Sequence, residues 1–144
     1  MSPDRDVILI EAAPDALDSD GLRTRLSTEG CGSIVSFLGI VRGVENGIEV
    51  HQLEFDAWEE KLEDTLHQLA VEAIEMFGVN GVAMSHRTGT VRPGEDIVCI
   101  HVSSPHRKDG FSACAWLIDE LKKQAPLWKK EVRADGVHWK EGLG

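Results

Sequence analysis

The segment 57–77 is the longest periodic stretch of the chain, and its spacing predicts an amphipathic helix. The apolar residues recur every three or four positions and form one continuous stripe: Trp58, Leu62, Leu66, Leu69, Ala73, Ile74 and Phe77. Acidic residues occupy the opposite face, and Gly78 is suited to end the helix. A helix with one apolar face must pack that face against a sheet or another helix, so this segment predicts a layered domain.

Two further helices are expected. Residues 108–125 give the stronger prediction, with Pro126 as the stop and a buried face made of Phe111, Cys114, Leu117, Ile118 and Leu121. Trp128, just beyond this stop, is expected to pack beneath the turn. A shorter helix is expected to begin near Ser19-Asp20 and to end at Gly30.

Apolar segments rich in valine and isoleucine predict strands between the helices. Residues 31–42 predict a long, largely buried strand, and residues 48–55 return after a hairpin turn at Asn46-Gly47. The apolar residues of the returning strand change face between Val50 and Leu53, which predicts a bulge. Further strands are expected at residues 7–10, 82–87 and 96–104, and in a hairpin of residues 129–132 and 137–140 around Asp135-Gly136.

This order of elements, hairpins interspersed with helices, predicts an α+β fold. The sheet is expected to be largely antiparallel, with three helices and a C-terminal β-hairpin. A length of 144 residues is typical of one domain, so the whole of 1–144 is expected to form a single domain.

Composition and motifs exclude several function classes. A net charge of −10 argues against nucleic-acid binding, and no apolar run approaches the 18 residues of a membrane span. Neither a signal peptide nor a disulfide framework is recognisable, which favours a cytoplasmic location. The six histidines form no HExxH pattern, and neither GxxxxGK[ST] nor GxGxxG occurs, so no metal and no cofactor is expected.

Positive charge is concentrated in residues 103–131. This stretch contains six of the chain's 15 lysines and arginines but only four of its 25 acidic residues. His106-Arg107 follows a strand and precedes a helix, where free N–H groups favour anions. Lys122 and Lys129, seven residues apart, become candidate bases or nucleophiles if they are partly desolvated. The alternative is that the lysines complement the helix dipole and lie on a solvated face.

Five motifs then reveal a resemblance. They are F-L-G-I-V-R (37–42), H-R-T-G (86–89), P-G-E-D-I-V (93–98), S-S-P-H-R (103–107) and L-K-K-Q-A-P-L-W-K-K-E (121–131). In order and spacing they resemble the family of the large, catalytic subunit of molybdopterin synthase. The resemblance covers roughly residues 30–139.

The resemblance implies an α/β-hammerhead fold and a function in molybdenum cofactor biosynthesis. It implies a sulfurtransferase whose homodimer forms the centre of a heterotetramer. The partner would be a small ubiquitin-like sulfur-carrier subunit that inserts its C-terminal thiocarboxylate into a pocket. The substrate would be cyclic pyranopterin monophosphate, which receives sulfur twice to form the molybdopterin dithiolene.

The resemblance also assigns roles to particular residues. The catalytic lysines of the family fall on Lys122 and Lys129. The substrate-binding residues fall on Phe37, Arg42, His106 and Arg107. The chain departs from the family at residues 56–58, where relatives tend to have Tyr-Pro-Gly. It also ends at Gly144, where relatives often have a longer basic tail.

Two alternatives to this enzyme remain open at the level of sequence. One is a non-catalytic anion-binding or scaffold module with the same fold and partner surface. The other is an independent enzyme acting on phosphate esters without a protein partner.

Overall fold

The computed structural model describes residues 6–140, and it confirms the predicted α+β fold with three helices and a C-terminal hairpin. The expectations for the first five residues and for the tail at Gly144 lie outside the described residues. The elements are β1 (Ile8–Ala13), α1 (Ser19–Arg25), β2 (Ser33–Ile40), β3 (Val44–Glu45), β4 (Ile48–Ala57), α2 (Glu59–Phe77), β5 (Gly81–Arg87), β6 (Gly89–Val91), β7 (Asp96–Ser104), α3 (Arg107–Gln124), β8 (Leu127–Arg133) and β9 (Gly136–Lys140).

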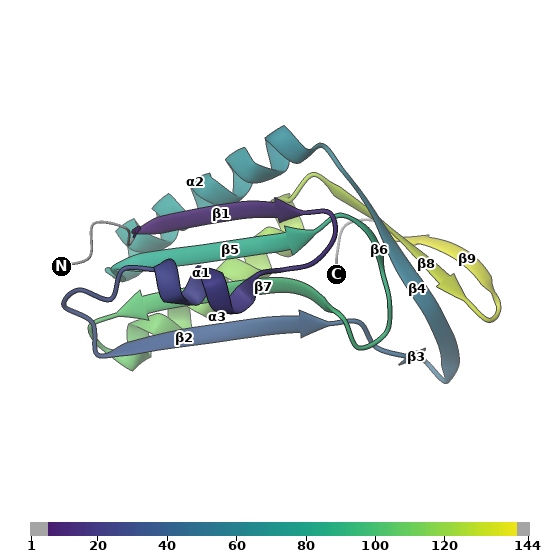
Figure 1. The fold of residues 1–144 in the computed structure, drawn as a ribbon, viewed down its shortest axis with the longest axis horizontal. Coiled ribbons are helices and arrows are strands. Elements are labelled where there is room, and N and C mark those ends of the chain that lie inside the picture. Colours follow the sequence, from purple (N-terminus) through teal and green to yellow (C-terminus); the bar gives the residue numbers. More distant parts are fainter. Residues whose placement is uncertain (1–5, 141–144) are drawn as a thin grey trace.

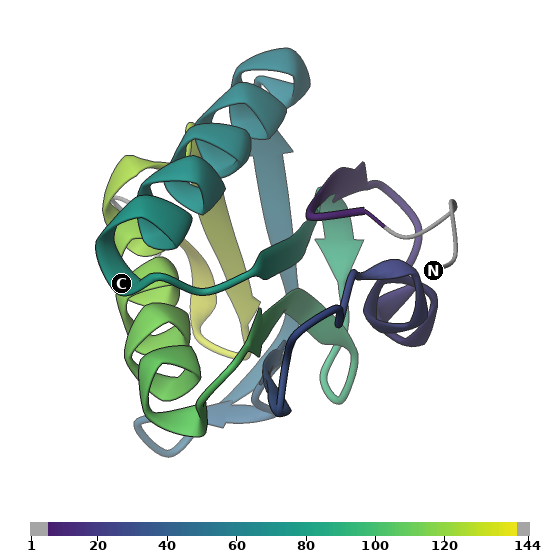
Figure 2. The same ribbon diagram turned by 90° about the vertical axis from the view of Figure 1, so that its left-hand side faces the viewer.

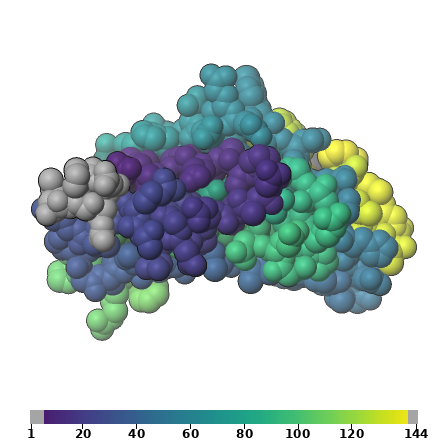
Figure 3. Space-filling view, in the orientation of Figure 1, coloured from purple at the N-terminus to yellow at the C-terminus, as the bar shows by residue number. Residues whose placement is uncertain are grey.

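The main sheet has four strands in the order β1-β5-β7-β2. Only β1 and β5 pair in parallel within it, so the expectation of a largely antiparallel sheet is confirmed. Helices α2 and α3 lie on one face and α1 on the other (Figure 2). Viewed from the α1 side, the segment with β1 and α1 covers much of the molecule's surface (Figure 3).

The two faces of the main sheet bury different side chains because neighbouring residues of a strand point in opposite directions. Val82 and Met84 of β5 belong to the large core together with the apolar stripe of α2. Ala83 of the same strand and Cys99 of β7 instead pack against Leu22 of α1. The apolar stripe of α2 therefore packs against the main sheet, as predicted.

A second sheet, in the order β3-β4-β8-β9 with β6 also paired to β4, lies at one end of the molecule (Figure 1). The pairing of β4 with β8 shifts register between Val50 and Gln52, which confirms the predicted bulge. The predicted C-terminal hairpin is confirmed as β8 and β9, with Gly136 at a φ of 123° in the turn.

Three aromatic side chains expected in the interior are exposed: Trp58, Phe111 and Trp128. Trp58 precedes the first turn of α2 as its N-cap residue. In α3 the helix approaches β2 through Gly110, where an added Cβ would lie 3.0 Å from a Val35 methyl, and this close contact directs Phe111 away from the sheet. Trp128 follows the inward-facing Leu127 in β8, so strand alternation turns it outward.

Two other expectations were wrong in detail. Helix α1 ends at Arg25, well before Gly30. Strand β2 is not largely buried, because it lies at the sheet edge and pairs only with β7, leaving Leu38 and Ile40 exposed. Its inward residues, Val35 and Phe37, still pack against the core.

We expect the stripe of α2 to carry a large part of the stability. Leu66→Ala removes a side chain with 0% exposure and should lower the free energy of unfolding by about 2–5 kcal/mol. Met76→Ala, on the exposed face of the same helix, should change it by no more than about 0.5 kcal/mol. Urea denaturation measures both, and equal effects would contradict the packing described here.

Candidate functional site

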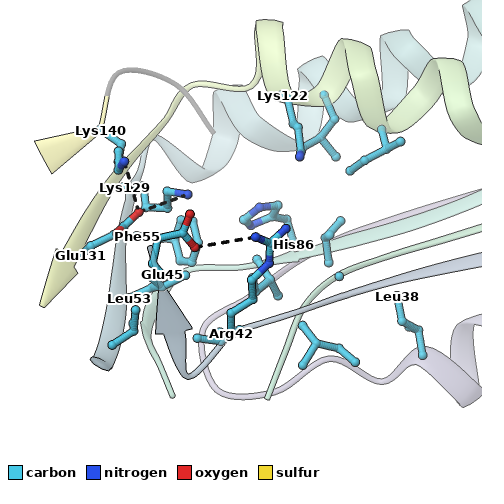
Figure 4. Close-up of a pocket in the computed structure, with 18 of the residues that line it drawn as sticks. Leu38, Arg42, Glu45, Leu53, Phe55, His86, Lys122, Lys129, Glu131 and Lys140 are labelled. Atoms are coloured by element: carbon cyan, nitrogen blue, oxygen red, sulfur yellow. Dashed lines mark ion pairs between the residues drawn. The ribbon is translucent and has the colours of Figure 1, made fainter. Parts of the chain in front are cut away.

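A pocket of about 390 Å³ lies where the main sheet, the second sheet and the C-terminal half of α3 meet (Figure 4). Its apolar wall includes Phe37 of β2, Phe55 of β4 and Leu121 of α3. Among the described residues, six charged ones also line it: Arg42, Lys122, Lys129 and Lys140 as cations, and Glu45 and Glu131 as carboxylates. The lining is therefore apolar on one side and predominantly cationic on the other.

The two lysines named from the sequence converge in this pocket because of the chain reversal after α3. Lys122 lies in the last turn of the helix, which ends at Gln124, and Pro126 follows the C-cap residue Ala125. Strand β8 then turns back along β4, with Leu127 and Lys129 on its inward side. Two residues that are seven positions apart in the chain thus line one cavity.

Lys129 is the more enclosed of the two lysines, with a side chain that is 16% exposed. Burial lowers its pKa below the ordinary value, whereas the carboxylate of Glu131 raises it. The positive charges of Lys140 and Lys122 lower the pKa further. An ammonium held in this way is suited to bind an anion that replaces its lost solvation.

Glu131 is the buried counter-charge of the pocket, with a side chain only 6% exposed. Its Oε1 lies 3.9 Å from Lys129 Nζ and 3.8 Å from Lys140 Nζ, and its Oε2 lies 3.9 Å from Arg133 Nε. These distances exceed those of hydrogen bonds, so the carboxylate attracts three cations without binding any of them tightly. The lysine ammonium groups keep their donors for a ligand.

Arg42 lies at the mouth of the pocket, two residues beyond the end of β2. Its side chain is 80% exposed, and its guanidinium is 3.8 Å from Glu45 of β3. An exposed ion pair of this length contributes little to stability, so Arg42 can exchange this partner for an anionic ligand. Phe37 lines the same pocket, as expected.

His86 is a pocket residue to which the sequence assigned no role. Its side chain is 2% exposed and packs edge-on against Phe55, with ring centroids 5.1 Å apart. Nδ1 lies 2.7 Å from the backbone carbonyl of Arg87, which can only accept, so Nδ1 carries the proton. Burial lowers the pKa of His86 from 6.5 to about 4, and the charge of Lys129 adds to this effect. The ring is therefore neutral near pH 7.

His106 and Arg107 do not line this pocket. His106 is the N-cap of α3, Arg107 is its first residue, and both side chains are exposed. At 1.5 Å per residue, Arg107 and Lys122 are about 22 Å apart along the helix axis. The structure thus brings Phe37, Arg42, Lys122 and Lys129 together and leaves the His-Arg pair at the other end of α3.

Four charged or polar residues among the described pocket lining were missed by sequence reasoning: Glu45, His86, Glu131 and Lys140. The sequence pointed to two of them, because His86 is the first residue of the H-R-T-G motif (86–89) and Glu131 is the last residue of the L-K-K-Q-A-P-L-W-K-K-E motif (121–131). The other two come from β3 and β9, whose positions depend on the second sheet.

Within residues 6–140 no three histidine, cysteine or acidic side chains form a metal-binding group. No helix of this part is long and apolar enough to cross a membrane. Burial raises the pKa of the Cys99 thiol, and that of Cys114 to about 11, so both thiols stay protonated.

Comparison with known proteins identifies the family. Residues 12–124 match the family model described as MoaE protein. The chain belongs to the MoaE family. A relative from Pyrococcus abyssi, named molybdopterin synthase catalytic subunit, is 38% identical over 81% of this chain and 79% of its own length.

Solved structures agree with this assignment. Molybdopterin synthase from Staphylococcus aureus has a TM-score of 0.86 and 32% identity, covering 91% of this MoaE-family chain and 96% of that chain. The complex of subunits 1 and 2 of molybdopterin-converting factor from Helicobacter pylori has a TM-score of 0.73 and 24% identity. It covers 94% of this chain and 91% of that chain, and this second likeness concerns the fold.

We expect Glu131→Gln to lower the pKa of Lys129 further, because the substitution removes the charge that raises it. An NMR titration of the lysine side-chain carbons measures the change. Glu54→Gln is the matched control, since Glu54 pairs with Lys130 at 2.6 Å and does not line the pocket. A pKa of Lys129 that stays constant or rises in Glu131→Gln would contradict the assigned role of the carboxylate.

Proposed function

We propose that this chain is a sulfurtransferase: the catalytic subunit of a molybdopterin synthase. Its membership of the MoaE family assigns it to molybdenum cofactor biosynthesis. The substrate is cyclic pyranopterin monophosphate, and the sulfur comes from the C-terminal thiocarboxylate of a small ubiquitin-like carrier subunit. The observation that carries the proposal is the convergence of Lys122 and Lys129 with Arg42 in one pocket.

The charge of the pocket suits both reactants. The substrate carries a phosphate and the carrier ends in a thiocarboxylate, so both are anions. Four cations against two carboxylates line the cavity, and partly buried cations attract anions more strongly than solvated ones do. Because the sulfur arrives on the carrier, no cysteine of this chain is needed.

The two lysines have different environments and therefore different proposed roles. Lys122 is exposed at the end of α3 and acts as general acid and base while it stabilises charge as the sulfur attacks. Lys129 is enclosed beside Glu131 and orients the substrate, supporting the same charge. Arg42 at the mouth binds the anionic groups as they enter.

A protein partner is part of the proposal. The Helicobacter pylori structure is a complex of two subunits of molybdopterin-converting factor. We infer that a small carrier likewise docks here and inserts an extended C-terminal tail at the pocket mouth. The proposed location is the cytoplasm, where the three free cysteines stay reduced.

A second copy of the chain is also required by the proposal. His106 and Arg107 are assigned to substrate binding, yet they lie at the start of α3, and Lys122 lies in its last turn. They can act on substrate only at the pocket of a neighbouring subunit. We therefore propose a homodimer at the centre of a heterotetramer. A non-catalytic scaffold is less favoured, because both residues that the resemblance assigns to catalysis, Lys122 and Lys129, line the same pocket.

Lys122→Ala and Lys129→Ala should each lower product formation at least about a hundredfold, since each removes a group that handles protons or charge in the reaction. The assay combines the purified chain, the thiocarboxylated carrier and cyclic pyranopterin monophosphate. Lys123→Ala and Lys130→Ala are matched controls outside the pocket lining and should retain most of the activity. Full activity of the first pair would remove the lysines from the mechanism.

Mixed dimers test the role of the second copy. A chain with Lys122→Ala and a chain with Arg107→Ala should each be impaired alone. In a dimer of the two, one pocket combines the unmodified Lys122 with the unmodified Arg107, so product formation should recover well above that of either variant. If mixing restores nothing, the residues do not act across subunits.

A further inference from the structure

We propose that His86 is a specificity-determining, substrate-binding residue, whose Nε2 accepts a hydrogen bond from a ring N–H of the nitrogen heterocycle in the pocket. This inference rests on the proposed function and names the feature that recognises the ring of the substrate rather than its phosphate.

One hydrogen bond to the backbone fixes the orientation of the His86 ring. Nδ1–H donates to the carbonyl of Arg87 at 2.7 Å, so Nε2 has a lone pair and no proton. Among residues 6–140, no side chain or backbone group donates a hydrogen bond to Nε2. The side chain is almost wholly buried and lines the pocket (Figure 4), so Nε2 is available to accept a hydrogen bond from a ligand bound there.

Apart from His86, the described residues that line the pocket are apolar or charged. His86 is the one uncharged polar side chain among the described residues that line it. The two carboxylates, Glu45 and Glu131, already face cations of the chain. Cations select for negative charge but accept it in many orientations, whereas one fixed acceptor requires a donor at one position. Among these residues, only His86 can require a hydrogen-bond donor at a fixed position without adding charge to the pocket.

The buried strand β5 and the contact with Phe55 hold the His86 ring, and with it Nε2, in a fixed position. Strand β5 is buried along its whole length, and the His86 ring stands edge-on against Phe55 at an interplanar angle of 81°. The low pKa of His86, about 4, keeps Nε2 free of a proton near neutral pH. Phe37 and Phe55 add aromatic surface to the pocket, which suits a flat heterocycle. A ring with an N–H and an attached anionic group matches all of these features.

The experiment compares two substitutions. His86→Phe keeps a ring against Phe55 but removes the acceptor, and it should raise the KM for cyclic pyranopterin monophosphate about tenfold or more. His86→Gln places an amide oxygen near the position of Nε2 and should recover most of the loss. Affinity for the carrier should stay unchanged in both. His67→Phe, at an exposed histidine of α2, is the matched control and should behave like the unmodified chain.

A spectroscopic measurement on the unmodified chain makes the test independent of folding defects. In protein labelled with ¹⁵N-histidine, the Nε2 resonance of His86 should shift when the pterin substrate binds. Inorganic phosphate has no ring N–H and should leave the resonance in place. A substrate that binds without moving this resonance, or a His86→Phe chain with an unchanged KM, would overturn the inference.

The outcomes also separate this inference from the proposed function. If the unmodified chain turns over but His86 does not respond, only the inference fails. If the pterin shifts the Nε2 resonance but no sulfur is transferred, the inference stands and the proposed reaction fails. If the chain neither binds the pterin nor turns over, both fail.

Discussion

The candidate site depends on one buried carboxylate. Lys129 and Lys140 line the same cavity as Lys122, and burying like charges together is unfavourable unless an opposite charge offsets them. Glu131 provides this charge from within β8, at 3.8–3.9 Å from the cations of its own sheet. Because these contacts are ionic but too long for hydrogen bonds, Glu131 offsets the positive charge of the lysines, which still have donors for a ligand.

The position of the cavity follows from the way α3 joins the two sheets. Gly110 lets the start of the helix approach β2 closely, and its apolar face continues along the main sheet to Leu121. The chain then reverses at Pro126 into β8, which pairs with β4 of the second sheet. The end of one helix and the beginning of one strand are therefore brought to the junction of the sheets, where Lys122 and Lys129 face the same space.

Three kinds of recognition meet in this space. In the proposed function, the cations would attract the phosphate and the thiocarboxylate, the aromatic side chains would provide surface for a flat ring, and the neutral His86 would provide one acceptor at a fixed place. Burial is the largest cause of the lowered pKa of both His86 and Lys129, so the site disfavours the charged form of both groups.

Local patterns in the sequence determined much of the fold. The spacing of Leu62, Leu66 and Leu69 defined α2, the change of face after Val50 defined the bulge, and Asp135-Gly136 defined the C-terminal hairpin. Motifs also named both pocket lysines. These features could be read because helix periodicity, strand alternation and turn chemistry act over a few neighbouring residues.

Only the tertiary structure decided which charges belong together. Along the chain, His106 and Arg107 belong to the same basic stretch as Lys122, but the rigid length of α3 puts them at its opposite end. The enclosed position of Glu131 and the neutral state of His86 were equally hidden from the sequence. Burial and charge state depend on contacts between segments that are distant in the chain, such as β5 with β4 or β8 with β4. A pattern of neighbouring residues cannot predict these contacts.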